Sequence, residues 1–172
     1  MKFDRRVRHF AASAEMREPK MHRIRRATSR DRDQLAALHL LFWPDCSIEE
    51  EKTAIDALIS AGVCGTLPAA VFVAEAADGA LIGFLTVGLR SHADGCDTAQ
   101  PVGFVEGWFV LEANRNQGIG AALMRAAEDW SREQGAIEMA SDSWLTHEAS
   151  HRAHQALGFE IVDRCVHFRK SL

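Results

Sequence analysis

The stretch Val110-Leu-Glu-Ala-Asn-Arg-Asn-Gln-Gly-Ile-Gly-Ala-Ala-Leu-Met124 indicates the fold more clearly than any other part of the chain. An apolar run, 103–110, leads into a polar turn, and two glycines, Gly118 and Gly120, open a segment with helical periodicity. Apolar residues then recur at steps of four, three and four, on one face of a helix: Ile119, Leu123, Ala126 and Trp130. The sequence therefore predicts a strand, a glycine turn and a helix.

The start of this predicted helix is suited to an anion. Its first backbone N–H groups have no intrahelical acceptor, and the positive end of the helix dipole lies behind them. Glycine lets the backbone approach a phosphate closely, and Arg115 adds positive charge. The alternative is a plain strand–turn–helix corner in which glycine only relieves backbone strain.

Composition indicates one globular domain of 172 residues, with 47% hydrophobic and 26% charged residues. We interpret residues 1–22 as a flexible N-terminal extension and residues 23–172 as the domain. Residues 1–20 hold six Lys or Arg and three Asp or Glu, whereas the whole chain has a net charge of −4. An acidic body disfavours nucleic acid and suits a cationic ligand, although solubility alone also explains it.

The lengths of the apolar runs and the spacing of the cysteines indicate the compartment and the metal content of the protein. No apolar run approaches the roughly 20 residues of a membrane span, and no signal-peptide core follows the basic start. The four cysteines are widely spaced and form no C-x-x-C pair: Cys46, Cys64, Cys96 and Cys165. We expect free thiols, a cytoplasmic protein, no membrane partner and no metal.

Local signals outline the remaining elements. They predict strands at 24–27, 69–76, 80–89, 102–110, 137–142 and 160–170. They predict helices from Thr28 or Ser29 to Pro44, from Ser47 to Gly62, from the glycine turn to about 135, and over 148–157. The order β-α-α-β-β-β-α-β-α-β predicts an α+β fold, an α/β sandwich with a mixed sheet.

Three side chains are candidates for chemistry. Glu106 lies within the 103–110 run, and we expect it on the same side as Phe104, Trp108 and Val110, lining a cleft. Asp142 ends the strand after the glycine-headed helix, where α/β sheets place ligands, although a loop or capping acid is equally consistent. His154 is a candidate proton donor because histidine titrates near neutral pH; a packed histidine is the alternative.

These pieces together resemble a known family. Arg115-Asn-Gln-Gly-Ile-Gly-Ala121 resembles the pyrophosphate-binding motif of the GNAT superfamily of acyl-CoA N-acetyltransferases, and the element order agrees. Five segments resemble the aminoglycoside 6′-N-acetyltransferases in particular: Trp43-Pro44, Asp94-Gly-Cys-Asp97, Val105-Glu-Gly-Trp-Phe-Val110, Ala140-Ser-Asp142 and His154-Gln-Ala-Leu-Gly-Phe-Glu160. The resemblance implies a mostly antiparallel GNAT sheet, acetyl-CoA as co-substrate, an aminoglycoside as the cationic substrate, and a homodimer.

The resemblance also implies roles for individual residues. It assigns cofactor contacts to Trp108, Phe109, Val110, Arg115, Asn116, Gln117, Gly118, Ile119, Gly120, Ala121 and His147. It assigns substrate contacts to Trp43, His92, Asp97, Glu106, Asp142 and Asp163, and catalysis to Glu106, Asp142 and His154. The chain contains no tyrosine, so the tyrosine acid of many GNAT enzymes is absent, and its place four residues before Gly158 holds His154.

The implied reaction is direct acetyl transfer to the 6′-amine of an aminoglycoside in a ternary complex, which confers antibiotic resistance. Four positions depart from the family pattern: Cys46, His92, His147 and Asp163 stand where histidine, tyrosine, asparagine and glutamate are common. Two other interpretations stay open at this point. One is a GNAT enzyme acting on protein amines or polyamines, and the other is a non-catalytic binder of acyl-CoA or aminoglycosides.

Overall fold

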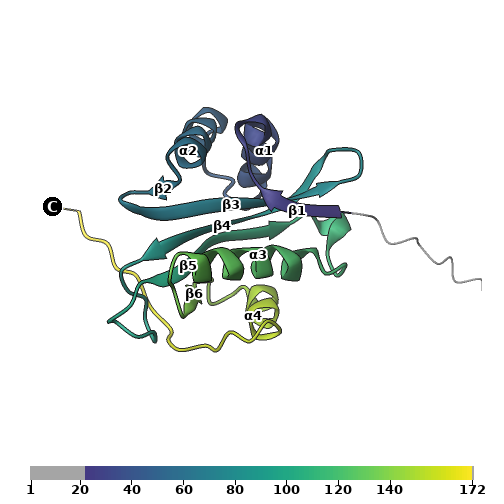
Figure 1. The fold of residues 1–172 in the computed structure, drawn as a ribbon. Helices are drawn as coiled ribbons and strands as arrows, with labels where there is room; N and C mark the ends of the chain where they lie inside the picture. The colour runs from purple at the N-terminus through teal and green to yellow at the C-terminus, as the bar shows by residue number, and fades with distance from the viewer. Residues whose placement is uncertain (1–21, 172) are drawn as a thin grey trace, which may run out of the picture.

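The computed structural model describes residues 22–171, which form a mixed sheet between two layers of helices (Figure 1). The strands are β1 (His22–Arg26), β2 (Val63–Cys64), β3 (Leu67–Ala76), β4 (Leu81–Arg90), β5 (Val102–Val110) and β6 (Met139–Ser141). The helices are α1 (Arg32–Phe42), α2 (Ile48–Ala61), α3 (Ile119–Glu133) and α4 (Glu148–Gln155), with 3-10 turns η1 (Ser29–Asp31) and η2 (Glu112–Asn114). The predicted extension over residues 1–22 falls almost wholly outside the described residues.

The sheet has the order β1-β3-β4-β5-β6, and β2 pairs with β3. Neighbouring strands run antiparallel except for β5 and β6, which are parallel. This arrangement confirms the predicted α+β fold with a mixed, mostly antiparallel sheet. The β5–β6 ladder covers only residues 103–105 of β5, so the two strands are not paired beyond Val105 and Ser141.

Each face of the sheet is covered by its own helices and has its own apolar core. Helices α1 and α2 lie over one face, and α3 and α4 lie over the other (Figure 1). The first core includes Leu35, Ile55, Val73 and Phe84. The second includes Leu85, Ile119, Leu123, Ala127 and Trp130. In α3 the fully buried alanine is Ala127, whereas predicted Ala126 is only half-buried.

The ends of α2 follow directly from its sequence. Ser47 accepts a hydrogen bond from the backbone N–H of Glu50 at 3.2 Å and donates its own hydroxyl to the Glu50 carboxylate at 2.8 Å. Gly62 ends the helix in the left-handed conformation, with φ of 66°. These contacts satisfy helix-end groups that otherwise lack partners, which confirms the predicted boundaries.

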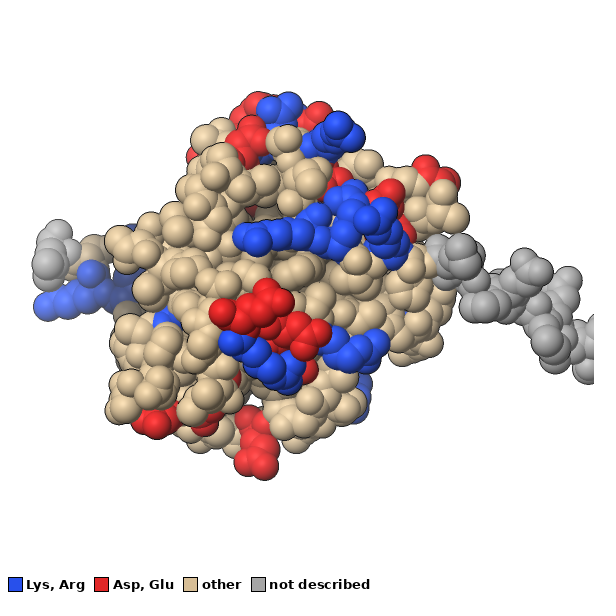
Figure 2. All heavy atoms as spheres, viewed as in Figure 1, with Lys and Arg blue, Asp and Glu red and all other residues tan. Residues whose placement is uncertain are grey.

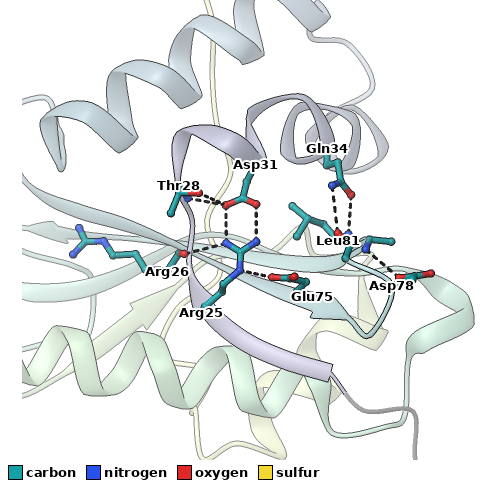
Figure 3. Close-up of polar contacts among 10 residues, drawn as sticks. Arg25, Arg26, Thr28, Asp31, Gln34, Glu75, Asp78 and Leu81 are labelled. Atoms are coloured by element: carbon teal, nitrogen blue, oxygen red, sulfur yellow. Dashed lines mark hydrogen bonds and ion pairs between the residues drawn. The ribbon is translucent and has the colours of Figure 1, made fainter.

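A polar cluster fixes β1 to the helical layer above it (Figure 3). Arg25 donates two hydrogen bonds to the Asp31 carboxylate, both at 2.7 Å, and a further one to Glu75 on β3. Asp31 also accepts from the N–H and hydroxyl of Thr28. Because the hydrogen-bonded Arg25 guanidinium favours the ionised carboxylate, it holds the pKa of the buried Asp31 at about 2.

Replacement of Asp31 by asparagine should lower the free energy of unfolding by about 2 kcal/mol at neutral pH. The folded-state pKa lies below the ordinary value, so this stabilisation is complete above about pH 4 and disappears as the pH falls toward 2. Denaturant unfolding of both proteins from pH 7 down to pH 3 measures it. Asp33→Asn, at an exposed carboxylate, is the control and should change stability little. A gap between Asp31→Asn and the native protein that is independent of pH would contradict this account.

The predicted last strand over 160–170 is wrong for this structure. Residues 159–171 form no strand, and α4 is followed by a turn at 156–158 and an extended segment. Local alternation predicted a strand, but a strand also needs a neighbour whose backbone groups complete its hydrogen bonds. Four apolar side chains of this segment are exposed: Ile161, Val162, Val166 and Phe168.

The surface carries both signs of charge. On the face shown in Figure 2, Lys and Arg side chains gather over β1, and Asp and Glu side chains lie over α3 with basic side chains directly beside them. The acidic excess predicted from composition therefore does not form one uniform acidic face on this side. Within residues 22–171, no helix is long and apolar enough to cross a membrane.

Candidate active site

A β-bulge sets the position of Glu106. Along the β4–β5 ladder, Thr86 is opposite Gly107 and Val87 is opposite Val105, so Glu106 is the extra residue. Bulges turn a side chain away from its regular direction and are common next to active sites. Glu106 is half-buried, and its carboxylate binds Arg90 at the end of β4 through two hydrogen bonds, of 2.6 Å and 3.0 Å. Arg90 thus supplies the counterion that a half-buried carboxylate needs.

The bulge also corrects the predicted side of Glu106. Trp108 and Val110 pack with the α3 core, whereas Phe109 packs with the α1 and α2 core. Glu106 instead shares a side with Phe104, because Arg90 lies over the Phe104 ring and binds Glu106. Strict alternation predicts the same side for Glu106, Trp108 and Val110, and the extra residue shifts that alternation by one.

Trp43 lies directly beside this bulge. A Cβ added to Gly107 would stand 2.6 Å from the Cη2 of Trp43, so only glycine permits this contact. The indole meets the edge of His39 with ring centroids 5.1 Å apart, and His39 binds Glu51 on α2 at 2.7 Å. Trp43 is therefore held against Gly107, the residue after Glu106, by contacts with α1 and through His39 with α2.

Asp142 follows β6 at the point where β5 and β6 stop pairing. Val105 is opposite Ser141 in the parallel ladder, so Glu106 and Asp142 come next on the two strands. Asp142 is exposed, and its carboxylate makes no hydrogen bond or ion pair within residues 22–171. The structure thus places two acids at adjacent strand positions, one bound to an arginine and one open to a ligand.

The glycine turn exposes a row of backbone N–H groups. The first bond of α3 runs from Ala122 N–H to Gly118 O at 2.9 Å, so residues 119–121 lack intrahelical acceptors. The N–H groups of residues 116–118 also have no acceptor among the described residues. Asn116 and Gly118 adopt positive φ, 59° and 77°, which shapes the turn. These N–H groups at a helix start form a site suited to a phosphate.

The two glycines of the turn serve different purposes. A Cβ on Gly118 would meet nothing within 4 Å, so Gly118 is required by its backbone conformation. A Cβ on Gly120 would stand 3.0 Å from Cζ2 of Trp108, so Gly120 lets α3 pack closely on β5. The interpretation of both glycines as approach points for a phosphate is therefore best supported for Gly118.

The end of β5 has an open edge. Arg115 donates from Nε to the carbonyl oxygen of Val110 at 3.0 Å, while Leu111 N–H bonds to Ile82 O on β4 at 2.9 Å. Successive N–H groups of a strand point to opposite edges. The Val110 N–H therefore points away from β4, toward the side where β6 no longer pairs. This places a donor between the glycine turn and the two acids.

The contacts of His154 on α4 show that its Nδ1 carries a hydrogen. Its Nδ1 lies 2.8 Å from the Ser150 carbonyl oxygen, which can only accept, so Nδ1 carries the hydrogen. Nε2 lies 3.0 Å from the Ser141 hydroxyl, which can donate to a neutral ring or accept from a charged one. The ring also packs edge-to-face on Trp108, with centroids 5.2 Å apart. His154 is thus linked to β6 by its contact with Ser141 and to β5 by its packing on Trp108.

The remaining predicted site residues lie in loops or at the start of a helix. His92 and Asp97 are exposed on the 91–101 loop, whose Asp97 N–H bonds to Glu138 at 2.7 Å. Asp163 is exposed next to Val162, which packs against Gly95 of that loop. His147 is the N-cap of α4, and its side chain makes no hydrogen bond within residues 22–171. Neither Asp163 nor His147 contacts Glu106 or the glycine turn by any bond in this part of the chain.

Together these features define a transferase-type site with two halves on one strand. The end of β5 leads into a turn lined by backbone N–H groups without acceptors, and its middle carries an acid next to the strand position of a second acid on β6. The comparisons with known proteins agree. The model of the acetyltransferase (GNAT) family matches residues 32–159, and the chain belongs to this family.

Similar proteins are known at moderate identity. The chain is 39% identical to the aminoglycoside N(6′)-acetyltransferase type 1 of Klebsiella aerogenes, over 87% of this chain and 96% of that protein. It is 40% identical to the protein of the same name from Stenotrophomonas maltophilia, over 87% and 93%. A solved structure of AAC(6′)-Iy with the bisubstrate analogue CoA-S-monomethyl-acetylneamine superposes with a TM-score of 0.79 at 32% identity, over 88% of this chain and 99% of that chain.

Two residues of the site were not predicted. Arg90 reaches Glu106 across the strand ladder, and Ser141 supports His154 across α4 and β6. A basic residue at the end of one strand and an acid in the next strand are a weak signal of an ion pair. The register of the two strands cannot be read across the 91–101 loop that separates them. Ser141 is adjacent to Asp142, but nothing in its spacing indicates a histidine partner.

Proposed function

We propose that this protein transfers the acetyl group of acetyl-CoA to the 6′-amine of aminoglycosides, by direct transfer in a ternary complex. The observation that carries the proposal is that one strand, β5, joins both halves of the site. Its end leads into the amide-lined turn, and its bulge holds Glu106 beside Asp142 and Trp43. The names of relatives that match nearly all of this chain support the same activity.

The acids gather and orient the cationic substrate. Asp142, which has no partner within the described chain, grips the reactive amine, and Glu106 assists it directly or through water. A carboxylate stabilises the ammonium form, so these residues act more as positioners than as strong bases. One amine loses its proton to a carboxylate or water and then attacks the thioester carbonyl. Orientation of the two reactants supplies several kcal/mol of the barrier reduction.

The cofactor half polarises the thioester. Residues 116–121 hold the pyrophosphate of acetyl-CoA, and the Val110 N–H donates to the thioester carbonyl oxygen as negative charge develops there. Collapse of the tetrahedral intermediate breaks the carbon–sulfur bond and releases the thiolate of CoA, and the nitrogen gives its second proton to a carboxylate or water to leave the neutral amide. When His154 is protonated, its Nε2–H donates to Ser141, whose hydroxyl proton passes to the thiolate.

Free-thiol release tests this function. Acetyl-CoA is supplied with tobramycin, an aminoglycoside that carries a 6′-hydroxyl, spermidine or a peptide. We expect thiol release with tobramycin and little with the other three. Release with spermidine or the peptide alone would indicate an amine acetyltransferase of another specificity. Binding of tobramycin without thiol release would indicate a non-catalytic binder. Acetylation of the 6′-hydroxyl drug would contradict 6′ regiochemistry.

We also propose that the protein is a homodimer, and the C-terminal segment supports this. Four exposed apolar side chains, including Val166 and Phe168, project from an unpaired extended segment, and such exposure is costly unless another surface covers it. In Figure 1 this segment runs past β6 and away from the sheet. A second copy of this chain offers a surface of the same kind.

Light scattering during gel filtration measures this assembly. The native protein should have a mass of about 38 kDa, twice the 19.0 kDa of one chain. Val166→Asp combined with Phe168→Asp should give monomers, because two charges would be buried in the interface. Leu41→Asp, at an exposed leucine on α1, should leave the dimer intact. A native protein that elutes at 19.0 kDa would overturn the proposal.

The predicted cytoplasmic location stays a prediction.

A further inference from the structure

The carboxylate of Glu106 already holds a cation. Arg90 donates from Nη2 to Glu106 Oε2 at 2.6 Å and from Nε to Oε1 at 3.0 Å. Both carboxylate oxygens are thus used by one guanidinium, the strongest common arrangement for this pair of groups. An ammonium that approaches Glu106 must share these oxygens or displace Arg90.

The guanidinium has a second support. Its Cζ lies 3.3 Å from the centre of the Phe104 ring, so the guanidinium stacks on this aromatic face while it binds Glu106. The pair is nevertheless reachable from solvent, because 43% of the Arg90 side chain and 30% of the Glu106 side chain are exposed. An exchange of partners therefore needs no opening of the core.

The two acids of the site consequently differ. Asp142 has no partner within residues 22–171, whereas Glu106 is occupied by Arg90. A substrate with one amine can be held by Asp142 alone. A substrate with several amines can also compete with Arg90 for Glu106.

We propose that Arg90 is a specificity-determining residue, an internal cation that substrate amines must displace from Glu106, so that the site favours polycations over monoamines. This inference rests on the proposed acetyl transfer. Arg90 neutralises Glu106 in the free enzyme. Only a ligand with several positive charges makes enough new ion pairs to offset the interaction free energy that is lost when the Arg90–Glu106 pair breaks. The arginine acts on the substrate through Glu106 and takes no part in bond making.

The test compares tobramycin with a monoamine, 6-amino-6-deoxyglucose, which carries only the reactive amine. Thiol release gives kcat and KM, and calorimetry gives affinity, for the native protein and for Arg90→Met, whose unbranched stem can still lie over Phe104. We expect KM and Kd for the monoamine to fall about tenfold in Arg90→Met, with a smaller change for tobramycin. The kcat/KM for tobramycin divided by that for the monoamine should therefore be about tenfold lower in Arg90→Met than in the native protein. Arg90→Lys, which keeps the charge, should retain most of the preference.

A double variant links the effect to Glu106. In a Glu106→Gln background, Arg90→Met should no longer change monoamine affinity, because the displaced pair is already absent. Arg90→Gln replaces Arg90→Met if the latter does not fold. A fall in kcat for both substrates with no gain in monoamine affinity would overturn the inference and leave Arg90 as a support for Glu106. A native protein that acetylates no aminoglycoside would instead refute the proposed function.

Discussion

Glu106→Gln and Asp142→Asn are each expected to lower kcat/KM for an aminoglycoside by about 100-fold or more. Both changes keep the size and polarity of the side chain but remove the charge that gathers and orients the reactive amine. The two residues follow the last paired positions of β5 and β6, so neither replacement removes an apolar contact of the core. The loss should therefore appear in turnover with tobramycin, measured by thiol release, while the thermal unfolding of the variants changes little.

The two variants should also differ from each other. Asp142→Asn removes a carboxylate with no partner within residues 22–171, so its affinity for acetyl-CoA should equal that of the native protein. Glu106→Gln leaves the Arg90 guanidinium without its ionised partner, and a larger rise in KM for the cationic substrate should accompany the loss of turnover. Asp129→Asn, which removes an exposed charge on α3, controls for general attraction of a polycation. Near-normal turnover in both site variants would refute the roles assigned to these acids.

Much of the fold could be predicted because its signals are local. The cap at Ser47 and the stop at Gly62 each depend on residues only a few positions apart. The glycine turn belongs to the same class, since positive φ at Gly118 and a periodic apolar face in α3 are both visible in the sequence. The acids Glu106 and Asp142 could be found because each interrupts or ends an apolar strand.

The features that could not be predicted depend on pairing between distant segments. The extra residue at Glu106 is defined only by the register of β5 against β4, and a single bulge reverses the side of every later side chain. The Arg90–Glu106 pair depends on the same register across the 91–101 loop. The segment over 160–170 has the alternation of a strand but pairs with no strand of the described chain, so the local pattern alone overstated its structure.

The final prediction separates the phosphate role of Gly118 from its role in folding. Gly118→Val should raise the Kd for acetyl-CoA by about tenfold or more. Gly118 has a φ of 77°, which is strongly disfavoured for a β-branched residue, although a Cβ there would meet no atom within 4 Å. Valine therefore either strains the turn or rotates it, and in both cases the N–H groups of residues 116–121 no longer converge on the pyrophosphate at low cost.

Gly135→Val is the matched control for this change. Gly135 lies at the other end of α3, has a φ of 87°, and also has open space around an added Cβ. Both variants should lose a similar amount of unfolding free energy, because both force valine into the same backbone region. Only Gly118→Val should weaken acetyl-CoA binding, as measured by calorimetry. Equal cofactor affinity in the two variants would mean that the turn after β5 is a structural corner, and that the anion is bound elsewhere.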